Sequence, residues 1–379
     1  MREIGIGIIG TGMMGKTHTY AIRNLPLFYK DLPFKARLIG ICSRQPDNAE
    51  RFREALGFEF ATDDYQKLIC HPDVEVVCIC TPNNLHHQMV IAAAKAGKHI
   101  YCEKPLAANE KESEEMLEAL REKDLVHQIV FNNRFFPATI RAKQMVQEGR
   151  IGKIQCFRIA YLQASAASPN RPVSWKQDKH YAGGVLLDLG SHVLDILYSM
   201  LGDYKRITAK TRTVLSDRTN EKDAIVDNDA ENSIVMIAEM MDGSIGTIEA
   251  TNVATGINNE LRFEIHGDRG AIRFNLMEPD WLDYFDETGQ EAPFGGDRGY
   301  KRIECIGNYE LPSSGFPSTK SSIGWLRAHV HSLYCFLDCV AAGRSAEPSL
   351  VDGAYIQHII ECARMSDEKG CWIDCCHDL

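Results

Sequence analysis

Residues 4–15 of this chain read IGIGIIGTGMMG, an apolar run that ends in the glycine motif Gly10-Thr11-Gly12-Met13-Met14-Gly15. The run predicts a buried strand, and a helical pattern follows it at about residues 15–24. A dinucleotide pyrophosphate needs a tight turn, close approach of the backbone and a helix N-terminus, and glycines at these three positions supply them. Alternatively, the glycines only shape a turn and let the helix pack closely. The strand before them and the helix after them favour dinucleotide binding.

Working outward from this motif, four further apolar runs alternate with helical patterns through residue 135. Such alternation predicts a doubly wound parallel sheet, so residues 1–135 are expected to form a Rossmann domain. After Pro137 and one more helix, long strands joined by turns predict a second α/β domain over residues 136–379, built on a mostly antiparallel sheet. The predicted strands are 4–9, 37–42, 74–80, 99–102 and 126–131 in the first domain, and 153–163, 205–213, 231–240, 244–254, 260–266 and 270–276 in the second.

Composition narrows the class of protein. The chain has 379 residues, 44% hydrophobic and 25% charged, which suits two globular domains, and its net charge of −10 argues against nucleic acid as a partner. No secretory leader is recognisable at the N-terminus, and the apolar stretch 185–201 is interrupted by charged residues, so no membrane span is expected.

The cysteine pattern indicates reduced thiols. Thirteen cysteines are scattered along the chain without a Cys-x-x-Cys motif, which favours a cytoplasmic location. The terminal Cys375-Cys376-His377 cluster lacks a second ligand pair at zinc-site spacing, so no metal site is predicted.

The end of the second strand bears on cofactor choice. Where NAD-binding proteins often carry an acidic residue for the adenosine ribose, this chain has Ser43-Arg44. A serine and an arginine suit the 2′-phosphate of NADP(H), whereas Asp47 bending back to the ribose would suit NAD(H). Both cofactors stay open, and the residues lean slightly towards NADP(H).

Two more motifs stand at predicted strand ends, where an open parallel sheet binds its ligand. The first is Thr81-Pro82-Asn83, with His86 three residues on, and we expect Asn83 and His86 to flank the nicotinamide ribose. The alternative is a helix cap and a surface turn. The second is Glu103-Lys104-Pro105, which places a lysine at the end of a buried strand, close to the expected cofactor.

Together these motifs, with Gly183-Gly184 and Asp188-x-Gly-x-His192-x-x-Asp195, resemble the glucose–fructose oxidoreductase/inositol 2-dehydrogenase (Gfo/Idh/MocA) family over nearly the whole chain. The resemblance implies a Rossmann domain, a second domain with a large open sheet, and action on sugars or cyclitols through NAD(H) or NADP(H). It also implies that Lys104, Asp188 and His192 are the catalytic residues. It further implies that the cofactor is bound by the glycine motif, by Thr81, Pro82, Asn83 and His86, and by Glu103 and Lys104.

Helical geometry tests the Asp188/His192 segment independently. If 184–201 is a regular α-helix, Gly184, Asp188, His192 and Asp195 share a narrow polar stripe on a mostly apolar helix. Mutual satisfaction of Asp188 and His192 inside an interface is the alternative. We expect His192 to be the general base, Asp188 to orient it and Lys104 to stabilise alkoxide charge. The further candidates for sugar contact are Arg134, Tyr161, Trp175, His180 and Asp195.

Two other functions compete with an NAD(P)-dependent sugar or polyol dehydrogenase. One is glycoside cleavage by elimination after transient oxidation of the sugar, and the other is a non-catalytic dinucleotide-binding regulator. The open sheet, with apolar positions such as Ile234, Met236, Ile245 and Ile248, leads us to expect a homodimer or homotetramer. The alternative is that helices of the same chain cover that face.

Overall fold

The computed structural model describes residues 1–168, 174–214, 217–219, 225–227, 229–289, 296–306, 316–318 and 320–376. The chain divides into two compact units, Met1–Phe135 with Glu310–Gln357, and Phe136–Tyr309 with His358–Leu379. The prediction assigned residues 310–357 to the second domain, whereas the structure places them in the first unit. The physical reason is that helix α8, Trp325–Ala342, places Val330, Leu333 and Leu337 in the apolar core of the first unit.

The first unit is the predicted doubly wound domain. Its six strands are all parallel and lie in the order β3-β2-β1-β4-β5-β6, which confirms the Rossmann fold. The short β3 and α3 were not predicted, because elements of three and five residues are too short to show a periodic pattern. The strands are β1 Arg2–Ile9, β2 Phe34–Cys42, β3 Phe60–Thr62, β4 Val76–Ile79, β5 His99–Cys102 and β6 His127–Ile129; the helices are α1 Met13–Phe28, α2 Pro46–Leu56, α3 Tyr65–Ile69, α4 His86–Lys95, α5 Glu110–Leu120 and α8.

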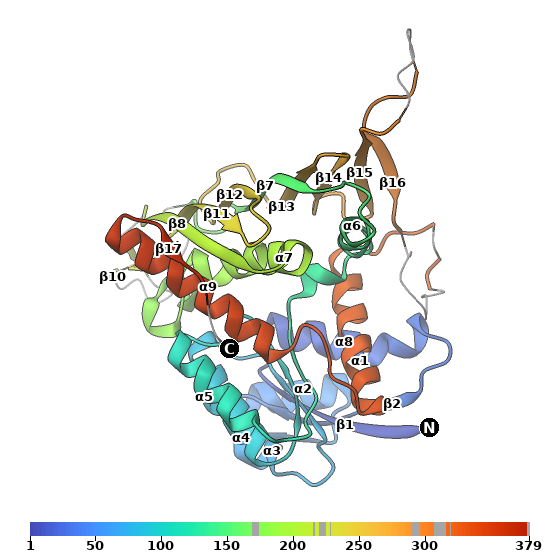
Figure 1. The fold of residues 1–379 in the computed structure, drawn as a ribbon. Helices are drawn as coiled ribbons and strands as arrows, with labels where there is room; N and C mark the ends of the chain where they lie inside the picture. The colour runs from blue at the N-terminus through green and yellow to red at the C-terminus, as the bar shows by residue number, and fades with distance from the viewer. Residues whose placement is uncertain are drawn as a thin grey trace. The chain divides into compact units, whose positions relative to one another are not determined.

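The second unit is built on a nine-stranded mixed sheet. Figure 1 labels its strands. Its order is β16-β15-β14-β13-β7-β12-β11-β8-β17, and β7 with β12 is the parallel pair in a sheet that is otherwise antiparallel. Helices α6 Pro137–Gln147, α7 Ser191–Leu201 and part of α9 Leu350–Lys369 belong to this unit. The strands are β7 Ile154–Gln163, β8 Tyr204–Arg212, β11 Ser233–Met240, β12 Ile245–Thr251, β13 Asn259–Gly267, β14 Gly270–Asn275, β15 Trp281–Asp286, β16 Lys301–Glu304 and β17 Ile373–Asp374, with β9 Asp217–Thr219 and β10 Ile225–Asp227 as a separate hairpin.

Helix α7 runs along one face of this sheet and packs on β7 and β12 (Figure 1). On this face Ile234 and Ile248 are 0% exposed and Met236 is 1% exposed. The prediction that these three residues meet a partner subunit is therefore wrong, because elements of the same unit cover them. Ile245 is 46% exposed and lies on the opposite face, which it shares with Val235 and Ile237.

The apolar stretch Lys179–Leu201 is long enough to cross a membrane by length and composition. Most of it, 78% of its most apolar window, is buried inside the protein, as in the core helix of a folded domain.

Candidate active site

The glycine motif forms the turn between β1 and α1. Gly10 has a φ of +116°, and a Cβ on it would lie 2.4 Å from the Cys80 carbonyl oxygen. A Cβ on Gly15 would lie 2.0 Å from the Gly10 carbonyl oxygen, so both positions exclude a side chain. Gly12, by contrast, is exposed and faces open space, and no side chain caps the first turn of α1. The turn thus presents helix N–H groups to an open cradle, which fits the pyrophosphate of a dinucleotide.

The other residues of this turn and of the β2 end lie beside it. The Thr11 hydroxyl donates to the Ser43 Oγ at 3.2 Å, so Ser43 borders the glycine motif. Arg44 is exposed, as is Asp47 in the first turn of α2. Met13 is 66% exposed and Met14 is half-buried, which leaves the open side of the turn lined by flexible apolar side chains.

The β4 end differs from the sequence-based prediction. Thr81 and Pro82 are half-buried, but Asn83 is only 5% exposed and His86 is 0% exposed. His86 points inward, with Nδ1 2.9 Å from the Pro105 carbonyl oxygen and Nε2 3.1 Å from the Thr81 carbonyl oxygen. Burial lowers the pKa of this imidazole. The prediction that His86 contacts a nicotinamide ribose is therefore wrong: the side chain lies buried between two strand-end carbonyls, and a neutral imidazole donates its single N–H to one of them.

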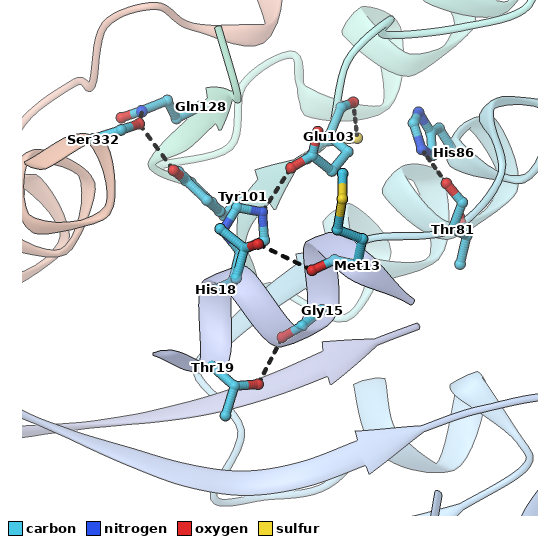
Figure 2. A network of polar contacts seen from close by, with 12 residues as sticks. Met13, Gly15, His18, Thr19, Thr81, His86, Tyr101, Glu103, Gln128 and Ser332 are labelled. Carbon is cyan, nitrogen blue, oxygen red and sulfur yellow. Dashed lines mark hydrogen bonds and ion pairs between the residues drawn. The ribbon is translucent and has the colours of Figure 1, made fainter. Parts of the chain in front are cut away.

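At the β5 end, Glu103 and Lys104 have different environments. Lys104 is half-buried, whereas Glu103 is 6% exposed and its Oε1 lies 2.7 Å from His18 Nε2. Figure 2 shows this contact together with the hydrogen bond between His86 and Thr81. The sequence did not single out His18, although its place one helical turn after the glycine motif was a usable signal.

Arg134, a predicted sugar contact, lies in the first unit. Its Nη2 is 3.7 Å from Asp352 Oδ1, and its side chain is 11% exposed. The Asp352 carboxylate also accepts hydrogen bonds from the Ser349 N–H and hydroxyl at the start of α9. Arg134 is thus paired with a carboxylate in the first turn of α9, and its side chain exposes little surface to a ligand.

In the second unit, Asp188 lies in a π-helical turn, Leu186–Gly190, which precedes α7. The regular helix assumed from the sequence is therefore wrong at this point. A π-turn inserts an extra residue per turn and changes which side chains share a face, and such turns are frequent at functional sites. Asp188 is half-buried and His192 is 5% exposed. Asp195, expected to contact sugar, is 0% exposed and presents no surface to a substrate.

Two side chains lie against this pair within the second unit. Lys176 Nζ lies 3.0 and 3.1 Å from the two Asp188 oxygens, so the carboxylate carries a direct cationic partner. The Tyr161 ring stands 5.8 Å from the His192 ring, and burial raises the pKa of the Tyr161 phenol. Trp175 is half-buried and His180 is exposed on the neighbouring short helices η3 Trp175–Gln177 and η4 Lys179–Tyr181.

Glu231 fixes the start of the Asp188 segment, and no sequence motif pointed to this residue. Its Oε1 accepts a hydrogen bond from the Leu186 N–H at 3.0 Å, and its carbonyl accepts one from Val185. Gly184 makes room for this carboxylate, since a Cβ there would lie 2.4 Å from Glu231 Oε1. Burial raises the pKa of Glu231. A carboxylate at a helix start also interacts favourably with the helix dipole.

Metal chemistry finds no support in the described part of the chain. No group of three or more His, Cys, Asp or Glu side chains there is arranged to hold a metal ion. Within the predicted terminal cluster, His377 lies outside the described residues.

Fold and site together define a class: an oxidoreductase with a dinucleotide-binding Rossmann domain and a second sheet domain carrying an Asp/His pair. Residues 4–131 match the GFO/IDH/MocA oxidoreductase family with its NAD-binding Rossmann fold, and residues 139–273 match the C-terminal domain of the same family. The chain belongs to the Gfo/Idh/MocA family, which confirms the resemblance stated from the motifs.

Individual relatives match over most or nearly all of the chain. Levoglucosan dehydrogenase of Pseudarthrobacter phenanthrenivorans is 35% identical, with 99% of this chain and 98% of that protein covered. A solved complex of a levoglucosan dehydrogenase with NADH and levoglucosan superposes with a TM-score of 0.94 at 34% identity, covering 99% of this chain and all of that one. Myo-inositol 2-dehydrogenase of Thermotoga maritima is 29% identical over 76% of this chain and 80% of that protein.

Proposed function

We propose that this protein is an NAD(P)-dependent dehydrogenase that oxidises a secondary hydroxyl of a sugar, glycoside or cyclitol, or reduces the corresponding ketone. The observation that carries the proposal is the open glycine cradle at the α1 N-terminus, in a chain that also holds the half-buried Lys104 and the Asp188/His192 pair. A bound nicotinamide dinucleotide supplies the hydride acceptor for this chemistry.

In the proposed reaction His192 takes the hydroxyl proton as general base, which suits an imidazole near neutral pH. Asp188 orients the imidazole and stabilises its charged form, and Lys104 donates to the substrate oxygen as negative charge develops on it. The ion pair with Lys176 supports an ionised Asp188 at neutral pH. Tyr161, Trp175 and His180 are proposed to contact the sugar.

The cofactor preference is a separate proposal. The structures of levoglucosan dehydrogenase hold NADH, which supports NAD(H) for this chain as well. The Ser43-Arg44 pair supports NADP(H), because a guanidinium binds a phosphate well. We propose NAD(H) as the working cofactor, and the ratio of kcat/KM for NAD+ and NADP+ in the wild-type protein and in Arg44→Ala tests it. A wild-type preference for NADP+ that disappears in Arg44→Ala would reverse the choice.

The substrate class follows from the relatives. Levoglucosan and L-sorbose are bound in complexes of levoglucosan dehydrogenase, and a second group of relatives consists of inositol 2-dehydrogenases. We propose levoglucosan-type anhydrosugars as the first class to test for this chain, with inositols second. The sequence identity of 35% with levoglucosan dehydrogenase, over nearly the full length of both proteins, supports this order.

The test is a screen of levoglucosan, L-sorbose, inositols, aldoses and glycosides with NAD+ and NADP+, followed by absorbance at 340 nm. Lys104→Ala and His192→Ala are expected to lose about 10²-fold or more in kcat. Equal turnover in either variant would contradict the assigned role. Cleavage of a glycoside without accumulated NAD(P)H would favour the elimination mechanism, and dinucleotide binding without turnover of any substrate would favour a regulator.

We also propose that the protein works in the cytoplasm as a homodimer or homotetramer. All thirteen cysteines are free thiols, as expected in a reducing compartment. Exposed apolar residues on the open face of the nine-stranded sheet support the oligomer.

A further inference from the structure

Lys104 emerges from a segment that is otherwise buried. Residues 101–103 and 105–107 are all buried, and Lys104 between them is half-buried. The backbone of Glu103 is fixed by its N–H, which donates to the Ile79 carbonyl oxygen at 3.0 Å. The direction of the lysine side chain therefore depends on what holds the residues on either side of it.

On the N-terminal side, His18 holds the side chain of Glu103. The two side chains are 0% and 8% exposed, and their closest atoms lie 2.7 Å apart. His18 Nδ1 is buried and has no hydrogen-bond partner among the residues that the structure describes. A hydrogen on Nδ1 would be costly there, so we assign the ring hydrogen to Nε2, which donates it to the Glu103 carboxyl group.

The His18 ring is itself held in place. It packs edge-on against the Tyr101 ring, with centroids 5.1 Å apart. The Tyr101 hydroxyl is bonded to the Ser332 hydroxyl at 2.8 Å, and the Gln128 amide donates to the same Ser332 oxygen at 2.9 Å (Figure 2). The Tyr101 ring against which His18 packs is thus anchored by its own hydrogen bonds, and the Glu103 contact fixes the other side of His18.

On the C-terminal side, His86 holds the backbone. Its Nδ1 lies 2.9 Å from the Pro105 carbonyl oxygen, one residue after Lys104, and the ring is 0% exposed. The Glu103 side chain and the Pro105 carbonyl therefore each lie within hydrogen-bonding distance of a buried histidine, with the Thr81 carbonyl as the second acceptor beside His86. The two histidines come from different helices, α1 and α4.

We propose that His18 and His86 are positioning residues for Lys104, acting through the Glu103 carboxylate and the Pro105 carbonyl respectively. This proposal rests on the role of Lys104 in the proposed function. Neither histidine touches the reacting atoms. Their effect is geometric: a catalytic group displaced by about 1 Å loses on the order of 10²-fold in rate.

Two variants at each position test it. His18→Phe keeps the ring against Tyr101 but removes the donor to Glu103, whereas His18→Gln keeps an N–H at a similar reach. His86→Phe and His86→Asn make the same comparison for the Pro105 carbonyl. We expect kcat to fall about tenfold or more in both Phe variants and to recover to within about threefold of wild type in His18→Gln and His86→Asn. NADH affinity, measured by fluorescence titration, is expected to stay within about twofold in all four.

A double-mutant cycle tests the connection through Glu103. If His18 acts through that carboxylate, His18→Phe combined with Glu103→Gln loses no more kcat than the worse single variant. His87 provides the control, because its Nε2 lies 2.8 Å from Glu115 Oε2 in a partly exposed pair of the same chemistry. His87→Phe should leave kcat unchanged.

Three results would overturn the proposal: unchanged kcat in the Phe variants, equal loss of kcat in each Phe variant and its conservative partner, or a loss of NADH affinity that matches the loss of kcat. Lys104→Ala separates this proposal from the proposed function. If that variant turns over normally, the role of Lys104 itself fails. If it is inactive while the Phe variants are unchanged, only the positioning by histidine fails.

Discussion

Gly184 shows how one residue without a side chain supports the candidate site. Its φ of +116° disfavours any residue with a Cβ, and a Cβ would also displace the Glu231 carboxylate from the Leu186 N–H. We expect Gly184→Ala to lower the free energy of unfolding by about 2–4 kcal/mol and to lower kcat, because Asp188 follows this turn directly. Chemical denaturation and steady-state kinetics measure the two effects.

Gly97 is the matched control for this prediction. It also has a positive φ, +71°, but a Cβ there would meet no atom within 4 Å. Gly97→Ala should therefore cost only the backbone strain, about 1 kcal/mol, with kcat unchanged. If both variants lose the same stability and Gly184→Ala keeps full kcat, the contact between Gly184 and Glu231 does not contribute to stability or activity as predicted.

Residues whose role depends on the backbone were predictable from the sequence. Residues whose role depends on whether the side chain is buried were not. The glycine motif was predictable because close approach of the backbone admits no other residue, as Gly10 and Gly15 show. His86 and His87 could not be separated in advance. One is fully buried between two carbonyls, and the other is partly exposed beside Glu115. Side-chain polarity does not reveal which of two adjacent histidines points inward.

At the scale of elements, helix α8 carries a buried polar network that makes stability depend on pH. Arg327 donates to the Tyr29 oxygen at 3.0 Å, so the Tyr29 hydroxyl donates to His331 Nδ1 at 2.7 Å. His331 must be neutral to accept that bond. Burial and the Arg327 charge lower the pKa of His331 to about 3.

Since the folded state holds His331 unprotonated and the unfolded state titrates near pH 6.5, stability is fully present above pH 6.5 and falls as the pH drops towards 3. From pH 6.5 to 5 we expect this residue to remove about 2 kcal/mol of the free energy of unfolding. In His331→Asn an amide oxygen replaces Nδ1 as acceptor and does not titrate. The loss between pH 7.5 and 5, measured by urea denaturation, should be smaller in that variant by about this amount, and an equal loss would contradict the assignment.

Elements with long periodic patterns were predictable, and those shaped by distant contacts were not. Apart from β3, the strands of the six-stranded and the nine-stranded sheet up to Asn275 lie within a few residues of the predicted bounds. Strands β15 and β16 were not predicted, and β16 lies inside residues 289–322, a segment rich in Gly, Pro and Ser. The π-turn at Leu186–Gly190 was missed because the apolar spacing around Asp188 also fits a regular helix.

For the whole molecule, the sequence indicated two domains but not how the chain is shared between them. Contiguous patterning assigned everything after residue 135 to the second domain, whereas Glu310–Gln357 belongs to the first unit. The reason is that the apolar face of α8 is complementary to α1 and the parallel sheet, and periodicity along a helix does not say which core the helix enters.

The state of assembly is the prediction that belongs to this scale. Val235, Ile237 and Ile245 are 52%, 39% and 46% exposed on the open face of the nine-stranded sheet. Ile237 stands there between Thr208 and Thr247, and Arg206, Lys210, Glu239 and Glu249 occupy the next positions of the same face. Ile237→Glu replaces an exposed apolar side chain of this face with a carboxylate. If a second copy covers this face, burying an unpaired carboxylate is costly, and the variant should move from an oligomer towards the mass of one chain in light scattering.

Leu27→Glu is the control for that experiment, because Leu27 is 58% exposed but lies on α1 in the first unit. It should keep the wild-type mass, since it adds the same charge away from the open sheet. A wild-type protein with the mass of a single chain in light scattering contradicts the oligomer. An oligomer that persists in Ile237→Glu shows that the subunits meet through another surface. Dissociation in Ile237→Glu alone would identify the open face as the interface, since Val235 and Ile245 are exposed apolar residues of the same face.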